Sequence, residues 1–128
     1  MHTKSKIMIA VVVGVAIGAA ATQGLNAQAK LKAYSIAEVE VLNPADLTSY
    51  VPPVRKKIGQ SHGLSLRTLS GRVVPIEGSP PPKNVAIVEW DSVDDAMAFY
   101  KSKAWTDLAP QRDKAQKTIR RYVVEVEK

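Results

Sequence analysis

Residues 84–105, NVAIVEWDSVDDAMAFYKSKAW, limit the possible folds more than any other part of the sequence. They begin with a mostly apolar run, which is typical of a strand buried on both faces. Ser92 then stands at an N-cap position, and Asp94 and Asp95 occupy a first turn, where the helix dipole favours acids. Inward-facing positions of this helix recur at helical spacing: Ala96, Phe99, Tyr100 and Lys103.

The first half of the remaining sequence predicts a strand and a helix. Residues 32–42 alternate apolar and polar side chains, which predicts a strand. Asn43-Pro44 ends it, and Asp46 is a candidate cap for the next helix. Proline is unfavourable in a helix interior, so we expect a helix that begins with Pro52-Pro53 and runs to about residue 60. Gly63 is a natural left-handed residue after its end.

The second half supplies the other strands and helical segments. Residues 64–78 alternate and predict a strand with a break at Gly71, followed by a polyproline-like connection over residues 79–83. A second helical piece is expected over residues 104–117, and a half-exposed last strand over residues 120–127. The order β-α-β-β-α-β predicts an α+β, ferredoxin-like fold: a four-stranded antiparallel sheet with helices on one face. The other face must be covered, and a twin subunit would cover it.

The N-terminus has the pattern of a secretory signal peptide over residues 1–29. A basic start precedes an apolar run of roughly 16 residues, short of the ~20 that a spanning helix needs, and the segment ends in Ala27-Gln28-Ala29. We therefore expect a domain over residues 30–128 in a periplasmic or secreted protein. The alternative is an uncleaved anchor, which would be the chain's one membrane contact. The sequence has no cysteine, so this small domain cannot form disulfides, and a homodimer is a reasonable expectation.

The charge pattern argues against nucleic acid as a partner. The formal net charge of +6 falls to +4 when Lys4 and Lys6 leave with the signal segment. The remaining basic residues are scattered along the chain, whereas nucleic-acid binding requires a dense basic face with interleaved aromatics. We expect no nucleic-acid partner.

An ordered set of residues resembles the domain of unknown function 1330 family. The set is Asn43-Pro44, Tyr50, Glu77-Gly78, Trp90-Asp91-Ser92, Ala96, Phe99-Tyr100, Ser102, Trp105 and Arg112. The resemblance implies a dimeric α/β-barrel, in which two ferredoxin-like sheets pack face to face, and it implies no established reaction. The chain departs from the family pattern after the first helix, where His62-Gly63-Leu64 replaces Gly-Gly-Arg and the arginine is lost or displaced to Arg67.

No strong catalytic or metal-binding signature is present. The chain lacks a cysteine nucleophile, a Gly-x-Ser-x-Gly elbow, a phosphate loop and a dinucleotide fingerprint. His62 is the one histidine of the domain, so a multi-histidine metal site is excluded. It could be a lone haem ligand or a general base, although a surface position at a helix end is the simpler interpretation. We assign no catalytic residue, metal or cofactor.

Six residues are candidates for ligand binding. Glu89 lies in an apolar strand, where burial would raise its pKa if it points inward. Arg112 offers a bidentate fork for a carboxylate, or a surface ion pair with Asp113. Tyr34, Tyr100 and Trp105 are candidates for the wall of a pocket, or simply for the core. His62 completes the candidate set. For Trp90 and Phe99 we expect core positions.

These observations favour an exported, dimeric protein that binds a small molecule without established catalysis. The alternative is a cofactor-independent enzyme of monooxygenase or isomerase type that acts on a small organic acid or aromatic compound. A third possibility is a haem-binding protein that uses His62. Fold analogy supports the last two only weakly.

Overall fold

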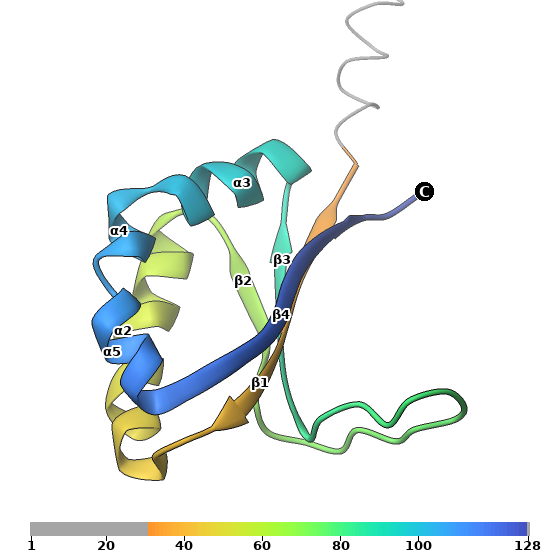
Figure 1. Cartoon of the computed structure of the whole chain (residues 1–128). Coiled ribbons are helices and arrows are strands. Elements are labelled where there is room, and N and C mark those ends of the chain that lie inside the picture. The colour runs from red at the N-terminus through yellow and green to blue at the C-terminus, as the bar shows by residue number, and fades with distance from the viewer. Residues whose placement is uncertain (1–30, 128) are drawn as a thin grey trace, which may run out of the picture. The chain divides into compact units, whose positions relative to one another are not determined.

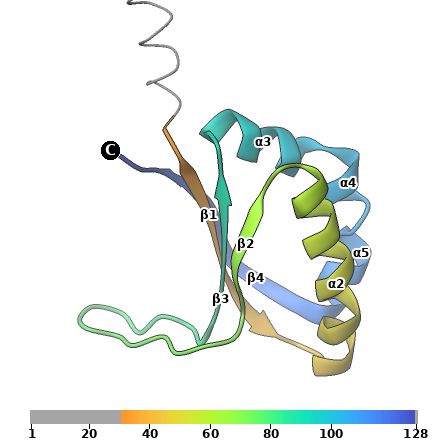
Figure 2. The same cartoon turned by 180° about the vertical axis from the view of Figure 1, so that it is seen from behind.

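The computed structural model describes residues 31–127, so the predicted signal segment lies outside the described residues. Its four-stranded sheet has the order β2-β3-β1-β4, and all neighbouring strands are antiparallel. The helices lie on one face of the sheet (Figures 1 and 2). The elements are β1 (Ala33–Val41), α2 (Pro44–Gln60), β2 (Leu64–Thr68), β3 (Asn84–Trp90), α3 (Val93–Lys101), α4 (Lys103–Thr106), α5 (Ala109–Ala115) and β4 (Gln116–Glu125). This order and topology confirm the predicted α+β, ferredoxin-like fold.

Helix α2 begins eight residues earlier than the prolines suggest. Asn43 caps it: the Asn43 side chain accepts hydrogen bonds from the backbone N–H groups of Ala45 and Asp46, so Asp46 is not the cap. Pro52 and Pro53 lie inside the helix. A proline at position 53 leaves the Ser49 carbonyl without its helical donor. Gln111 Nε2 donates to that carbonyl over 3.2 Å, so a contact from α5 satisfies the group and the helix continues.

The end of α2 is a Schellman motif centred on His62. His62, rather than the expected Gly63, is the left-handed residue, with φ of 66°. The Gly63 N–H donates to the Ile58 carbonyl over 2.9 Å, and the His62 N–H donates to the Gly59 carbonyl over 3.1 Å. Gly63 is required for a different reason: an added Cβ would lie 2.7 Å from Ile58 Cγ2 and 2.8 Å from the Trp90 ring.

Gly63→Ala is therefore expected to lower the free energy of unfolding by about 1–3 kcal/mol, the usual cost of overpacking. Gly59→Ala is the matched control, because nothing lies within 4 Å of its added Cβ inside the same helix. The control is expected to raise stability by about 0.5–1 kcal/mol, since alanine orders at lower entropic cost than glycine. Urea unfolding followed by circular dichroism measures both, and equal effects of the two variants would contradict the close packing at Gly63.

Strand β2 is shorter than predicted, and residues 69–83 form a loop. Leu69, Gly71 and Gly78 have positive φ angles of 75°, 98° and 84°, so the chain turns where a strand was expected. Arg67 fixes the base of the loop: its Nε donates to the Val85 carbonyl over 2.7 Å, and its Nη2 donates to the Gly71 carbonyl over 3.0 Å. The loop projects from the side of the sheet opposite the helices (Figures 1 and 2).

The predicted helical piece over residues 104–117 is two short helices, and the last strand begins earlier than expected. The extended backbone of Ser102 separates α3 from α4, and Pro110 lies in the first turn of α5. Strand β4 starts at Gln116 because β1 is long enough to pair with it there: Gln116 lies opposite Val41, and Lys117 lies opposite Glu40. The bulge opposite Glu38 and Val39 shifts the register within this pair.

The core between the sheet and the helices is built on Trp90. Its side chain is 1% exposed, and its ring centroid lies 5.2 Å from that of Phe99. Trp90 Nε1 donates to Ser35 Oγ over 3.0 Å, and Ser35 Oγ lies 2.6 Å from the Tyr100 hydroxyl. The predicted core positions of Trp90 and Phe99 are confirmed. The Ser92 cap is confirmed too, because its side chain accepts a hydrogen bond from the Asp95 N–H.

Candidate functional site

The sheet register separates the candidate residues into two groups. Tyr34 lies opposite Glu89 on β3, on the face of the sheet that carries no helices. We call this the open face. Tyr100 on α3 and Trp105 on α4 lie on the helix-covered side, and Arg112 on α5 packs beside them. The six candidates therefore do not converge on one cavity.

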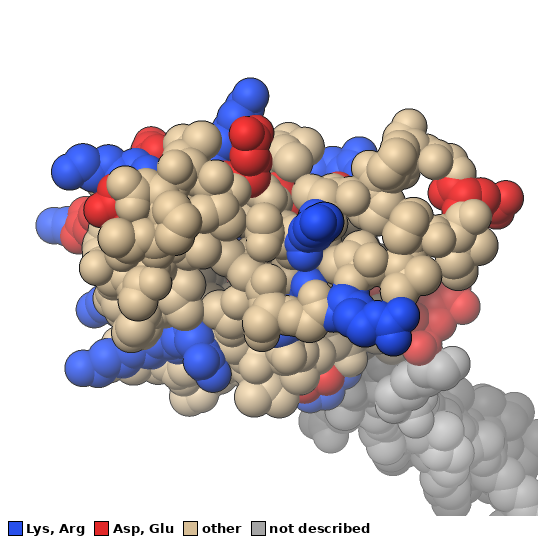
Figure 3. All heavy atoms as spheres, turned by 90° about the horizontal axis from the view of Figure 1, so that it is seen from below, with Lys and Arg blue, Asp and Glu red and all other residues tan. Residues whose placement is uncertain are grey.

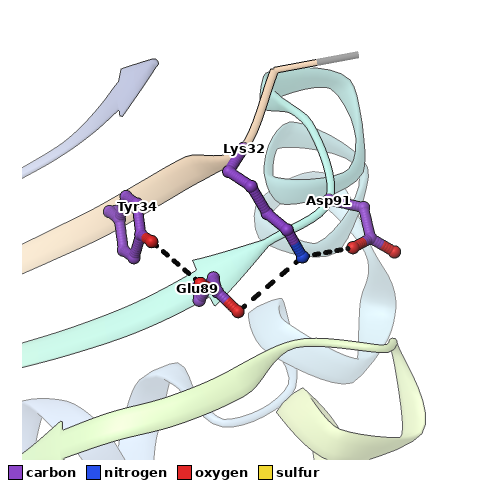
Figure 4. A network of polar contacts seen from close by, with 4 residues as sticks. All are labelled: Lys32, Tyr34, Glu89 and Asp91. Carbon is purple, nitrogen blue, oxygen red and sulfur yellow. Dashed lines mark hydrogen bonds and ion pairs between the residues drawn. The ribbon is translucent and has the colours of Figure 1, made fainter. Parts of the chain in front are cut away.

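The Tyr34 group forms a polar network at one end of the open face (Figure 4). The Tyr34 hydroxyl donates to Glu89 over 2.8 Å, and Lys32 Nζ lies 3.8 Å from the same carboxylate. Lys32 also donates to Asp91 over 3.1 Å. The hydrogen bond to Glu89 raises the pKa of Tyr34, with burial as a smaller cause. Because the polar groups of this network bind one another, Glu89 has its partners in Tyr34 and Lys32 and needs no ligand to satisfy it.

His62 lies apart from both groups. It is exposed in the turn after α2, where its left-handed backbone serves the helix end. Within residues 31–127 no group of three or more histidine, cysteine, aspartate or glutamate side chains is placed to hold a metal ion. In the same range no helix has the length and apolar content needed to cross a membrane.

A cavity of about 50 Å³ lies between the sheet and the helices, and we call it the inner cavity. Its walls are largely apolar side chains of α2 and the sheet, among them Val39, Val51, Val54, Ile58 and Val88. Tyr100, Trp105 and Arg121 line it as well, and the same three residues line an adjoining surface hollow of about 350 Å³. We call this second space the outer hollow. These three residues therefore stand where the two spaces adjoin.

Two guanidinium groups pack on the Trp105 ring. Arg112 Cζ lies 3.8 Å from the ring centroid and Arg121 Cζ lies 4.6 Å from it, both within cation–π range. Tyr100 meets the same indole edge-on, with centroids 4.9 Å apart. The arrangement concentrates two positive charges at one aromatic wall. Burial raises the pKa of the nearby Tyr50 phenol, which faces Arg112.

Arg121 is the site residue that the sequence interpretation missed. The sequence predicted only a half-exposed last strand over residues 120–127, whereas the structure places Arg121 opposite Ala37 on the helix-covered face. The pair Arg120-Arg121 held the relevant signal, because neighbouring residues of a strand point to opposite faces. One arginine of that pair had to point inward, and the pattern alone did not show which.

Within the part of the chain that the structure describes, Arg121 and Arg112 have no carboxylate partner. The ion pairs found within residues 31–127 join Lys32 to Glu89 and to Asp91, and Arg120 to Glu38. The alternative of an Arg112–Asp113 ion pair is therefore absent from the described residues. Burial lowers the pKa of Arg121, yet a guanidinium remains charged at any physiological pH. The cost of desolvating Arg121 is thus not relieved by losing its proton.

The open face carries large apolar side chains and the carboxylate of Glu38, which is bound by Arg120. Leu64, Leu66, Tyr122 and Val124 are 40–55% exposed. Glu38 lies among them with its side chain 7% exposed, and Arg120 Nη2 donates to it over 2.9 Å. This bond to Arg120 is the main cause that lowers the pKa of Glu38.

Charged side chains are dispersed on the end of the molecule shown in Figure 3, where Lys and Arg alternate with uncharged residues. This dispersion matches the scattered basic residues of the sequence. A nucleic-acid site would require a continuous basic face.

Comparisons with known proteins address family and fold. The profile of the domain of unknown function 1330 family (DUF1330) matches residues 32–126. No protein with a curated description matches the chain. Among solved structures, a protein of unknown function from Rhodopseudomonas palustris is 11% identical, with 76% of this chain and 82% of that chain covered and a TM-score of 0.49. A conserved protein from Methanosarcina mazei Go1 is 12% identical, with 78% and 97% covered and a TM-score of 0.49. Since the family profile spans nearly all of the described residues, the chain belongs to the DUF1330 family.

Proposed function

We propose that this protein binds a small molecule in the inner cavity. The observation that carries the proposal is a partly open space with largely apolar walls, lined by Arg121, which has no carboxylate partner among the described residues. Ligand sites are typically concave and largely apolar, with a few polar groups that fix orientation. The inner cavity has this composition, with Arg121 and Tyr100 as the polar groups at the outer hollow.

We also propose that the working form is a homodimer joined through the open faces. The apolar residues Leu64, Leu66, Tyr122 and Val124 support this, because a sheet face of this kind is normally covered. The loop of residues 69–83 projects on the same side of the sheet and carries Ile76, which is 94% exposed (Figures 1 and 2). A second copy would cover both features, and face-to-face sheets are the arrangement of a dimeric α/β-barrel.

Export is the third part of the proposal, and it rests on the sequence of residues 1–29 alone. Mass spectrometry of the protein recovered from producing cells tests it. Export with cleavage predicts a chain that begins at Lys30. A recovered chain that still carries Met1 or the rest of this segment would contradict cleavage.

Nuclear magnetic resonance tests the cavity directly through the indole N–H signal of Trp105. We expect that at least one compound in a panel of small organic acids, alcohols and amines shifts this signal in a saturable way. Ala86→Leu should abolish the response, because Ala86 lines the inner cavity and a leucine would fill it. Ala98→Leu is the matched control, since Ala98 is exposed on α3 and does not line the cavity.

Two results would overturn the proposal. One is the absence of a saturable shift with every compound of the panel. The other is an equal response in the wild type and in Ala86→Leu, which would place the binding outside the inner cavity.

A further inference from the structure

We propose that the ligand is a short-chain monocarboxylate, held by the guanidinium of Arg121 with its apolar chain in the inner cavity. This inference rests on the proposed small-molecule function and deepens it. The first argument is charge. Arg121 lies between the sheet and the aromatic wall, and among the described residues no carboxylate faces it. Arg121 is half-buried, and charges taken out of water are normally paired, so the missing counter-charge is expected from a ligand.

The second argument is what Arg121 already binds. It packs 4.6 Å from the centroid of the Trp105 ring and 5.7 Å from that of Tyr100. Every fully buried side-chain nitrogen and oxygen within residues 31–127 has a hydrogen-bond partner. Arg121 itself is half-buried, and its contacts in the described residues are with aromatic rings rather than with a negative charge. Aromatic faces stabilise a cation only partly, whereas a carboxylate accepts two parallel hydrogen bonds from a guanidinium.

The third argument is size and shape. A cavity needs about 10–15 Å³ to hold one water molecule, so about 50 Å³ has room for roughly four non-hydrogen atoms. Valine, isoleucine and alanine side chains make up much of its wall and suit a hydrocarbon chain. Arg55 and Arg67 line the cavity as well, but Arg55 is exposed to solvent and Arg67 donates to the Val85 and Gly71 carbonyls. Arg121 lines both the inner cavity and the outer hollow, so it lies where the charged end of such a ligand would meet solvent.

Arg112 acts through Trp105 in this proposal. Its guanidinium packs 3.8 Å from the ring centroid, and its Nη1 lies 3.5 Å from the Trp105 carbonyl oxygen. Arg112 does not line the inner cavity. It is therefore a positioning residue that holds the indole against Arg121, and it adds positive potential at the site.

The test compares propionate with propionamide, which has the same shape and no charge. Both are titrated at pH 7 and constant ionic strength, and the indole signal of Trp105 reports binding. Because a hydrogen bond to a charged group contributes about 1.5–3 kcal/mol, we expect propionate to bind about 10- to 100-fold more tightly. In Arg121→Gln the ratio of the propionamide and propionate dissociation constants should fall to nearly one. Arg72→Gln removes the same charge from an exposed loop and should preserve the wild-type ratio.

The outcomes separate this inference from the function on which it rests. Equal affinities for propionate and propionamide would contradict the proposed preference for a carboxylate, but they would leave the proposed small-molecule function standing. If other compounds of the panel bind but neither propionate nor propionamide shifts the Trp105 signal, the carboxylate preference is likewise contradicted and the small-molecule function stands. A preference that survives Arg121→Gln would overturn the role of Arg121. If Arg121→Gln does not fold, Arg121→Lys replaces it: a preference reduced several-fold supports the bidentate contact, and an unchanged preference contradicts it.

Discussion

Trp90→Ala is expected to lower the free energy of unfolding by about 3–5 kcal/mol. The side chain is 1% exposed and packs on Phe99 and Tyr100, with centroid distances of 5.2 and 5.9 Å. Its removal leaves a cavity at the centre of the core and also takes away the donor to Ser35 Oγ. Since domains of this size have a total stability of roughly 5–15 kcal/mol, the variant is expected to be marginally folded or unfolded.

Urea unfolding measured by circular dichroism tests this expectation. Trp90→Phe separates the two contributions, because it keeps most of the ring and loses the indole N–H. We expect it to cost clearly less than the alanine variant. Met97→Ala is a surface control, since that side chain is 36% exposed on α3. A loss below about 1 kcal/mol for Trp90→Ala would mean that Trp90 is not the centre of the core.

The second large effect is expected from a charge at the centre of the open face. Ile36 lies opposite Ile87 on β3 and opposite Tyr122 on β4, so it occupies the middle of that face. In the proposed dimer, Ile36→Lys places two new ammonium groups in one symmetric interface. Buried unpaired charges cost several kcal/mol each, so the dissociation constant should rise by at least about 100-fold. The protomer should stay folded, because Ile36 is part of the open face and not of the core cluster.

Analytical ultracentrifugation gives the masses, and circular dichroism checks the fold of each variant. Ala98→Lys adds the same charge at an exposed position of α3, on the helix-covered side, and should leave the dimer intact. A wild type that sediments as a monomer would refute the dimer itself. A dimeric Ile36→Lys variant would place the interface elsewhere than on the open face.

Periodicity and capping residues predicted the order of elements, because each of these signals depends on nearby residues alone. Ser92 with Asp95, and the alternation around Tyr34, are local patterns of this kind. The errors arose where a distant contact decides the outcome. Helix α2 continues through Pro53 because Gln111, far along the chain, donates to the Ser49 carbonyl. The turn at Leu69 similarly depends on Arg67, which fixes both ends of the loop.

The candidate site shows the same division between local and distant information. Residue types identified Tyr100, Trp105 and Arg112 as candidates, and the structure brings these three together. Tyr34 and Glu89 lie on the opposite face, because the face of a strand residue depends on its register with neighbouring strands. Arg121 was missed for the same reason. The bulge in the pairing of β1 with β4 sets which arginine faces inward, and the sequence of β4 alone does not contain that shift.

A crystal structure of the protein grown with propionate tests the central claim most directly. We predict one propionate per chain, with its carboxylate against the Arg121 guanidinium and its methyl group among Val54, Ile58 and Val88 in the inner cavity. Crystals grown with propionamide should hold only water there. An inner cavity that excludes propionate, or a propionate bound with its carboxylate away from Arg121, would contradict the account.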